Sequence, residues 1–475
     1  MPLPAVVWLR NDLRLADNPA LSAAASAGPV IPLFILDETV GTRPLGGAAR
    51  WWLDKSLRAL SVDLADRGAA LVFRRGSAEQ VLQEVIAETG ARSVYWNRLY
   101  DASAVCRDGK IKAALRATGV TTGSFNGSLL NEPWAVKTGA GGPYRVFTPY
   151  WRAALPFADE SAPDIAPPTL QGFEGPLASD QVDDWSLHPR KPDWSSGFID
   201  WRPGEAGAQA RLASFLSSGI DNYVDLRNRP AVSGTSRLSP HLHFGEISPR
   251  QIWAAAKAAA AERRAPPRQI DGFLRELGWR EFNHQLGFHF PRMEQEGFNP
   301  RFLNFPWRED PVGAEAWRRG RTGFPIVDAG MRELWATGWM HNRVRMIAAS
   351  FLIKDLLVDW RVGEAWFWDT LVDADLANNL AGWQWVAGSG ADAAPYFRVF
   401  NPVLQGEKFD PDGSYVRRWV PELARLPDAC IHQPWRAGSD ILSAAGVSLG
   451  VTYPAPIVDH AVARDRALAA YERLA

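Results

Sequence analysis

The segment NNLAGWQWVAGSGADAAPYFRVFNP, residues 378–402, combines amide and indole side chains but contains no histidine or cysteine. Asp375, Asn379 and Trp383 lie four residues apart, so they would share one face of a helix. Trp385 would point about 200° away from Trp383, because each helical residue turns by roughly 100°. The two tryptophans should therefore have different surroundings. Such groups can orient and tune a bound cofactor, although a tryptophan pair that only packs a core fits the spacing as well.

A second candidate site lies in SGTSRLSPHLHFGEIS, residues 233–248, where three hydroxyl residues surround Arg237 ahead of a helical run. The three are Thr235, Ser236 and Ser239. Hydroxyls, the free amides of a helix start and one guanidinium together would suit a phosphate group. A capped loop is the alternative, because serine and threonine favour helix N-caps in any protein.

Two further segments place polar and large side chains at helical i, i+3 and i+4 spacing. They are Glu276, Trp279 and Arg280 in FLRELGWREFNHQ, and Asn342, Arg345 and Met346 in GWMHNRVRMIAASFL. Each triplet would lie on one helix face. Taken alone, both also fit ordinary amphipathic helices, in which methionine usually fills the core.

The elements that would position these residues change along the chain. Short apolar runs alternate with helical patterns at first, which is typical of a parallel sheet covered by helices. These runs are 5–10, 29–37, 69–74 and 93–97. No G-x-G-x-x-G follows the first run, so the usual dinucleotide fingerprint is missing. Residues 155–204 are rich in Pro, Ser, Asp and Gly, and later segments have helical spacing. We predict an α/β domain, a connector and a large helical domain, at 1–130, 131–204 and 205–475.

The whole chain sets wider limits. Its 475 residues favour two or three domains, and a formal net charge of −1 indicates no global basicity for nucleic acid. Two cysteines, Cys106 and Cys430, are too few for a disulfide framework or a four-thiolate cluster. We expect no metal site. No apolar run approaches the ~20 residues of a membrane span, so we expect a soluble cytoplasmic protein.

Taken together, the motifs resemble one family, the photolyase/cryptochrome flavoproteins. They are VWLRNDLRLADNPAL, TSRLSPHLHFGEIS, ELGWREFNHQ, GWMHNRVRMIAASFL, KDLLVDWRVGE, GWQWVAGSGADAAPYFRVFNP and QGEKFD. They cover nearly the whole chain in the order of that family, and the C-terminal set is highly specific. The resemblance is to bacterial cyclobutane pyrimidine dimer photolyases. It implies a Rossmann-like antenna domain and a helical domain that binds FAD folded into a U.

The resemblance also implies the cofactor residues. Tyr223, Thr235, Ser236, Arg237, Leu238 and Ser239 would hold the FAD phosphates and their surroundings. The rest of FAD would be lined by Arg280, Asn342, Arg345, Asp373, Asp375 and Asn379. Arg345 and Asp373 would form an ion pair beside the isoalloxazine, and Asn379 would face N5 of the flavin, where an amide can both donate and accept.

The implied reaction is light-driven DNA repair without a protein nucleophile. Reduced FAD would donate an electron to a cyclobutane pyrimidine dimer, the ring would open and the electron would return. Trp383, Trp360 and Trp307 match the tryptophan chain that reduces oxidised flavin in this family. The alternative within the family is a blue-light photoreceptor, a cryptochrome. A flavin oxidoreductase has no support from a nicotinamide fingerprint.

The implied partner is UV-damaged DNA, whose dimer must leave the duplex to reach a buried flavin. Trp279 and Trp385 match the positions that pack on the flipped-out dimer, Glu276 would hydrogen-bond the base edges, and Met346 would contact the dimer. The candidates for DNA phosphate contacts are Arg227, Arg343, Arg398 and Lys408. Such contacts position the DNA without reading its sequence.

One short segment and a few single positions indicate the subclass and the antenna. FNGSLLNEPW, residues 125–134, resembles class III photolyases and plant cryptochromes, whereas Asn379 favours a photolyase over the plant cryptochromes, where Asp is usual. Ser103 and Ala104 stand where enterobacterial relatives carry the Asn-Glu pair of their folate site. We expect 5,10-methenyltetrahydrofolate as the antenna, bound in the different manner of class III relatives, with a deazaflavin or a second flavin as alternatives. We expect a monomer.

Overall fold

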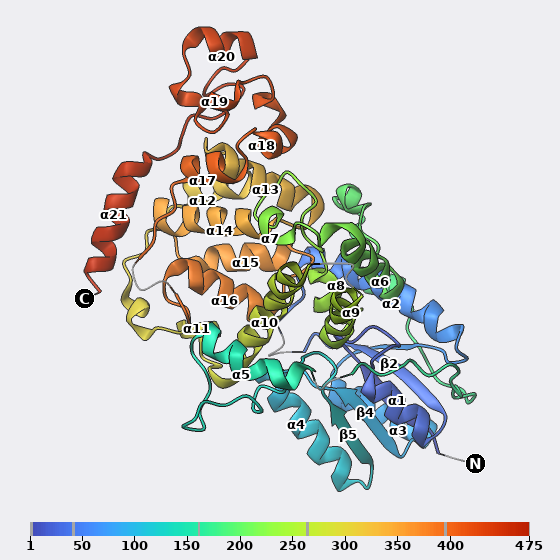
Figure 1. The fold of residues 1–475 in the computed structure, drawn as a ribbon. Helices are drawn as coiled ribbons and strands as arrows, with labels where there is room; N and C mark the ends of the chain where they lie inside the picture. Colours follow the sequence, from blue (N-terminus) through green and yellow to red (C-terminus); the bar gives the residue numbers. More distant parts are fainter. Residues whose placement is uncertain (1–2, 40–42, 160–161, 263–265, 394–396, 475) are drawn as a thin grey trace. The chain divides into compact units, whose positions relative to one another are not determined.

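The computed structural model describes residues 3–39, 43–159, 162–262, 266–393 and 397–474 (Figure 1). It divides into two compact units. The sheet unit comprises the chain up to Trp194, together with Ile199–Asp221 and Ser236–Pro291. The helical unit comprises Ser195–Phe198, Asn222–Thr235 and the chain from Arg292 onward.

The sheet unit contains five parallel strands in the order β3-β2-β1-β4-β5. The strands are β1 (Ala5–Leu9), β2 (Val30–Leu36), β3 (Val72–Arg75), β4 (Ser93–Asn97) and β5 (Thr121–Phe125). The predicted Rossmann-like parallel sheet is confirmed. β5 was not predicted, because its sequence TTGSF lacks the apolar run that marked the other four strands.

Helices cover this sheet, and every residue of β1 and β2 is buried. Val6, Trp8, Ile31, Leu33 and Ile35 share one core with residues of α3 and α4. The helices of the unit are α1 (Pro19–Ala27), α2 (Gly47–Ala65), α3 (Ala78–Thr89), α4 (Ala102–Ala117), α5 (Phe147–Asp159), α6 (Glu205–Ser214), α8 (Ser239–His243), α9 (Pro249–Ala261) and α10 (Pro267–His289).

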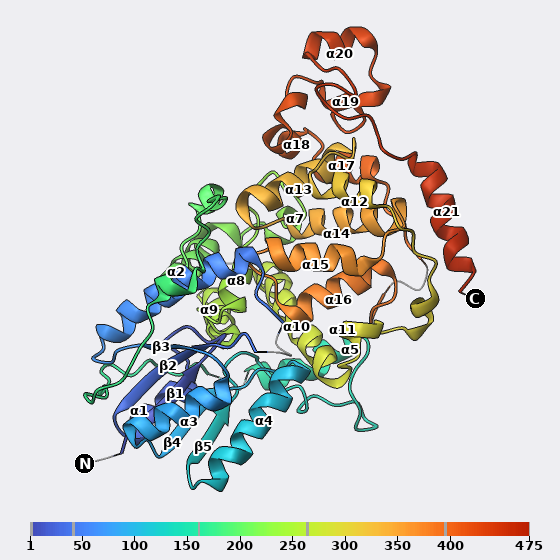
Figure 2. The same cartoon turned by 180° about the vertical axis from the view of Figure 1, so that it is seen from behind.

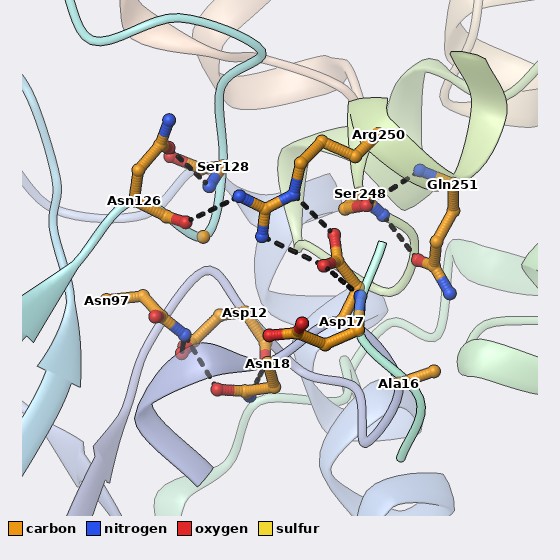
Figure 3. Close-up of polar contacts among 12 residues, drawn as sticks. Asp12, Ala16, Asp17, Asn18, Asn97, Asn126, Ser128, Ser248, Arg250 and Gln251 are labelled. Atoms are coloured by element: carbon orange, nitrogen blue, oxygen red, sulfur yellow. Dashed lines mark hydrogen bonds and ion pairs between the residues drawn. The ribbon is translucent and has the colours of Figure 1, made fainter. Parts of the chain in front are cut away.

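A buried ion pair joins the loop after β1 to the start of α9. Nε and Nη2 of Arg250 donate to the two carboxylate oxygens of Asp17 at 3.0 and 2.9 Å (Figure 3). In the same loop region, Nδ2 of Asn97 donates to Asp12 and to Asn18, both at 2.7 Å. Because a buried charge must be paired to be tolerated, this network holds α9 against the end of β1.

The helical unit packs around one large apolar core, and Figure 2 shows α13, α14, α15 and α16 lying next to one another. Its helices are α7 (Tyr223–Leu226), α11 (Met293–Glu296), α12 (Pro311–Arg318), α13 (Pro325–Thr337), α14 (Asn342–Ser350), α15 (Trp360–Thr370), α16 (Leu376–Ala387), α17 (Pro402–Phe409), α18 (Ser414–Trp419), α19 (Asp428–Ile431), α20 (Ser439–Ala445) and α21 (His460–Glu472). A π-helical segment, Phe351–Asp355, follows α14 directly. The predicted helical C-terminal region is confirmed.

The predicted domain boundaries, at residues 130 and 204, stay a prediction. The segment predicted as connector contains a 13-residue helix, α5, and this helix packs against α10 within the sheet unit. The predicted phosphate-binding segment from Ser236 onward shares a compact unit with the sheet. So do Glu276, Trp279 and Arg280 on α10.

Glu281 anchors α10 to the segment that follows β5. Its Oε2 accepts from the backbone N–H groups of Leu130 and Asn131 at 2.9 and 3.0 Å. Burial raises the pKa of this carboxyl to about 7, against the opposing effects of Arg280 and of the two backbone donors. The folded protein therefore binds a proton that the unfolded chain has released above its ordinary pKa of 4.5.

We predict that Glu281→Gln removes a pH dependence of stability. In the wild type, stability should fall as pH rises from 4.5 to about 7, because the folded state binds more protons there. The limiting slope is about 1.4 kcal/mol per pH unit. Urea midpoints at about pH 5 and about pH 7.5 measure it. Glu84→Gln, at an exposed carboxylate of α3, is the control; an equal flattening in both variants would contradict the assignment to Glu281.

Candidate functional site

Asp375, Asn379 and Trp383 are brought together by α16 as their spacing predicted. Asp375 is the N-cap residue, and its side chain accepts from the backbone N–H of Asn378 at 2.9 Å, which starts the helix. One turn later, Nδ2 of Asn379 donates to Oε1 of Glu364 at 2.8 Å. Because Glu364 accepts from the amide nitrogen of Asn379, the side-chain carbonyl oxygen of Asn379 can accept from another donor. Glu364 lies on α15, and the sequence analysis did not single it out.

Trp383 lies in the core, at 2 % exposure, against α15. A Cβ on Gly363 would come within 2.1 Å of its ring, so only glycine permits this packing. Trp360 lies one turn before Gly363 on the same helix and is also buried. The side-chain Nε1 of Trp383 is buried and donates to no acceptor in the described part of the chain.

Trp307 lies at the margin of the same core, where it is partly buried. The N–H of Arg308 donates to the carbonyl of Leu357 at 2.8 Å, which holds the Trp307 segment close to the start of α15. The three tryptophans of the predicted chain thus share one core cluster and run from two fully buried positions to a partly exposed one. Their electron-transfer role stays a prediction.

Trp385 has different surroundings from Trp383, as expected. It is half-buried, and its Nε1 donates to the carbonyl oxygen of Asp392 at 3.2 Å. This leaves part of the indole accessible on a different side of α16.

Arg345 and Asp373 form the predicted ion pair. Nη2 of Arg345 lies 2.8 Å from Oδ2 of Asp373, and Nε donates to the carbonyl of Met340 at 2.7 Å. The carboxylate side chain is 2 % exposed and the guanidinium side chain 23 %. A pair so shielded from water keeps both charges in place and orients the guanidinium. Asn342, on the same helix, is exposed.

Two of the predicted phosphate-binding cations, Arg343 and Lys408, lie beside Phe409. The guanidinium carbon of Arg343 lies 4.4 Å from the ring centre, and Nζ of Lys408 lies 5.3 Å from it. Burial and then the charge of Arg227 lower the pKa of Arg343. Neither Arg343 nor Lys408 forms an ion pair with a carboxylate of the described residues. This concentration of positive charge suits an anion.

Two further residues orient Arg343, and the sequence analysis missed both. Nη2 and Nε of Arg343 donate to Oδ1 of Asn228 at 2.7 and 3.2 Å, while Phe409 supports the flat guanidinium. Met346 lies beside this group, with its sulfur 3.7 Å from Nη1. Tyr223 begins α7 and carries the Arg227 guanidinium over its ring at 5.4 Å. Arg398 is exposed, next to buried Phe397.

The sheet unit holds the remainder of the predicted phosphate loop. Arg237 has a φ of 51°, a left-handed conformation that costs a non-glycine residue roughly 1–2 kcal/mol. Its guanidinium lies 6.0 Å from the ring centre of Trp201. Leu238 is buried, Ser236 is half-buried and Ser239 begins α8, which is only five residues long. Thr235 is half-buried at the end of the preceding segment of the helical unit.

On α10, Glu276, Trp279 and Arg280 are all half-buried. Trp279 lies flat on Phe147, with ring centres 3.8 Å apart and planes at 8°. Nη1 of Arg280 donates to the carbonyl of Ser128 at 2.7 Å and lies 3.4 Å from Glu281. This hydrogen bond ties the Arg280 guanidinium to the segment that follows β5.

Each unit holds residues that suit one part of a flavin dinucleotide. Hydroxyls and a guanidinium in the loop around Arg237 suit a diphosphate, while Asn379 and the Arg345–Asp373 pair suit a planar ring with donors and acceptors. A strained Arg237 and a buried, unpaired Nε1 of Trp383 each cost free energy in the protein alone, which a bound cofactor can offset. No group of three or more metal-ligating side chains occurs within the described ranges. None of the helices described there is long and apolar enough to span a membrane.

A parallel α/β unit with a helical unit rich in tryptophan, amide and arginine defines a flavoprotein of the photolyase type. The family model described as DNA photolyase matches residues 5–168, and that described as FAD binding domain of DNA photolyase matches residues 273–473. The chain belongs to the photolyase/cryptochrome family, as its motifs predicted.

The similar proteins include enzymes and photoreceptors. A deoxyribodipyrimidine photo-lyase of Agrobacterium fabrum is 53% identical over 98% of this chain and 97% of its own length. Cryptochrome-1 of Arabidopsis thaliana is 40% identical over 97% of this chain and 69% of its own length. The crystal structure of a class III photolyase from Agrobacterium tumefaciens matches with a TM-score of 0.97 and 52% identity, covering 100% of this chain and 98% of that one.

We predict that the protein holds FAD noncovalently. No histidine or cysteine lies among the residues of the two candidate FAD segments, 235–239 and 373–383, so none there can attach the flavin. Heat denaturation followed by filtration should release all flavin absorbance into the filtrate. Flavin that stays with the precipitated chain would contradict this prediction.

Proposed function

We propose that the protein repairs cyclobutane pyrimidine dimers in DNA under blue light, with reduced FAD as the electron donor, and that it is a class III photolyase. Two observations carry the proposal, one from each unit. In the sheet unit, the half-exposed indole of Trp279 lies flat on Phe147. In the helical unit, Arg343 and Lys408, which form no ion pair with a carboxylate of the described residues, lie beside Phe409. The 53% identity to a photo-lyase over almost the whole chain supports it.

When bound, FAD supplies the electron that opens the cyclobutane ring. The chain's own residues then have three tasks. Asn379, held by Glu364, presents its carbonyl oxygen to a donor such as a ring N–H. Arg345 and Asp373 hold a fixed charge pair, and Trp383, Trp360 and Trp307 connect the interior to the surface for electron transfer.

The substrate residues have separate tasks. Trp279 and Trp385 offer indole surfaces for a flipped-out pyrimidine dimer, Glu276 offers a carboxylate for base edges, and Met346 offers an adaptable apolar contact. Arg227, Arg343, Arg398 and Lys408 bind backbone phosphates. The cationic cluster supports this division, because Arg343 reaches Met346 while Asn228 and Phe409 orient it.

The antenna, assembly and location are further parts of the proposal. We propose 5,10-methenyltetrahydrofolate as the antenna, with a deazaflavin as the alternative. A second flavin is a third option, since an archaeal photolyase from Sulfolobus tokodaii that resembles this chain holds two FAD molecules. We propose a cytoplasmic monomer. One absorption spectrum of the chromophores extracted from the purified protein separates the three antennas.

A blue-light photoreceptor is the alternative function, favoured by 40% identity to plant cryptochromes. The deciding experiment mixes the purified, reduced protein with an oligonucleotide that carries one thymine dimer. Blue light should restore the undamaged strand with many turnovers, and a dark sample should not. Light-driven flavin chemistry without any dimer splitting would favour the photoreceptor.

We predict that Trp360→Phe slows flavin photoreduction and spares repair. Phenylalanine keeps most of the buried ring volume, so FAD content should be unchanged, but it is far harder to oxidise than indole. Photoreduction of oxidised flavin by an external reductant should become much slower. Repair by chemically pre-reduced protein should stay within about twofold of wild type, because the repair electron does not use this route. Unchanged photoreduction would show that another tryptophan path dominates.

We predict that Trp279→Ala and Arg343→Ala affect DNA binding differently. Base–aromatic stacking is worth roughly 1–3 kcal/mol, so Trp279→Ala should weaken binding of dimer-containing DNA by about 5- to 150-fold and leave undamaged DNA nearly unaffected. Arg343→Ala should weaken both ligands alike and reduce the salt dependence by about one phosphate contact. Fluorescence anisotropy in the dark, at several salt concentrations, measures both. Equal loss for the two DNAs in Trp279→Ala would show that this residue does not read the lesion.

A further inference from the structure

The rings of Phe147 and Trp279 stack closer together and more nearly parallel than most aromatic pairs. Phe147 is 0 % exposed and begins α5, whereas Trp279 lies in the middle of α10. Their ring centres are 3.8 Å apart with planes at 8°, so the phenyl covers one face of the indole. Aromatic pairs in proteins more often meet at about 4.5–7 Å, offset or edge to face.

The backbone around this pair is built for close approach. A Cβ on Gly278 would come within 2.6 Å of the ring of Trp151, so α10 lies as near to α5 as a glycine permits. Trp151 in turn lies parallel to Phe147, with ring centres 6.3 Å apart and planes at 12°. Three rings, from Trp151 through Phe147 to Trp279, are therefore nearly parallel.

Phe282 packs beside both rings without lying parallel to either. Its ring meets the indole edge to face, at 6.0 Å and 76°, and meets Phe147 in the same manner at 5.9 Å and 72°. Phe147 covers one face of the indole, so a base that stacks on Trp279 must use the opposite face.

We propose that Phe147 is a positioning residue for lesion recognition: it fixes the plane of Trp279, so that one indole face is ready to stack on a flipped-out pyrimidine dimer. This inference rests on the proposed function. Its physical basis is preorganisation, because a side chain that is already immobile loses less conformational entropy when the ligand binds. Phe147 touches no DNA and acts only through Trp279.

The test compares two phenylalanines of the same aromatic cluster. Phe147→Leu removes the flat ring under the indole, and Phe282→Leu removes the ring at its edge; both positions are buried, at 0 % and 1 %. Phe147→Met is a second variant that keeps the volume with a flexible chain, in case the branched leucine disturbs folding. Each variant is purified with its FAD, and binding to a thymine-dimer oligonucleotide and to its undamaged counterpart is measured in the dark.

We expect Phe147→Leu and Phe147→Met to weaken dimer binding by about 2- to 12-fold, the equivalent of ~0.5–1.5 kcal/mol for one side chain that must be immobilised on binding. Binding of undamaged DNA should not change, and repair per absorbed photon at saturating dimer should stay at the wild-type value. Phe282→Leu should lower thermal stability to a similar extent and keep the preference for the dimer.

Three results would overturn the inference: no loss of dimer preference in either Phe147 variant, equal loss for both DNAs, or the same loss of preference in Phe282→Leu. Trp279→Ala separates the inference from the function on which it rests. If Trp279→Ala reduces dimer preference and the Phe147 variants do not, stacking stands and positioning fails. If Trp279→Ala has no dimer-specific effect, the stacking role itself fails and the inference falls with it.

Discussion

The buried ion pair between Asp17 and Arg250 is the contact on which the placement of half the candidate site depends. The Asp17 side chain is 1 % exposed and that of Arg250 12 %, so neither charge could remain there alone. Both carboxylate oxygens accept from Arg250, and one also accepts from the N–H of Asp164. Separating α9 from the end of β1 would expose or orphan these charges. Arg237 and the helix with Trp279 belong to the same compact unit as the sheet.

In the helical unit, too, polar partners from other segments hold side chains in place. Glu364 binds Asn379, Asp373 binds Arg345 and Asn228 binds Arg343, so these three predicted functional side chains each have a partner that fixes their direction. A cofactor that carries the chemistry requires orientation from the protein more than reactivity. This explains why the site consists of amides, ion pairs and indoles, and why no cysteine or histidine nucleophile is needed in it.

The predictable parts of this molecule are those that local spacing determines. A helix brings Asp375, Asn379 and Trp383 to one side whatever surrounds it, and the motifs were long enough to identify the family. The partners were not predictable, because they come from distant segments: Asn228 lies 115 residues from Arg343, and Phe147 precedes the helix of Trp279 by more than a hundred residues. No periodicity encodes such contacts. Strand β5 was not predicted for a different reason: its sequence, TTGSF, is too polar to indicate a strand.

The charge distribution bears on how a lesion could be found among undamaged DNA. The chain has a formal net charge of −1, so in the proposed function the attraction to DNA would come from local groups such as Arg343 and Lys408 beside Phe409. A few phosphate contacts give weak, salt-sensitive binding that is the same for every sequence. Discrimination must then come from the uncharged contacts. A flipped dimer carries a smaller unpairing cost than an intact pair. In the proposed function, a preset indole face would convert that difference into residence time on the lesion.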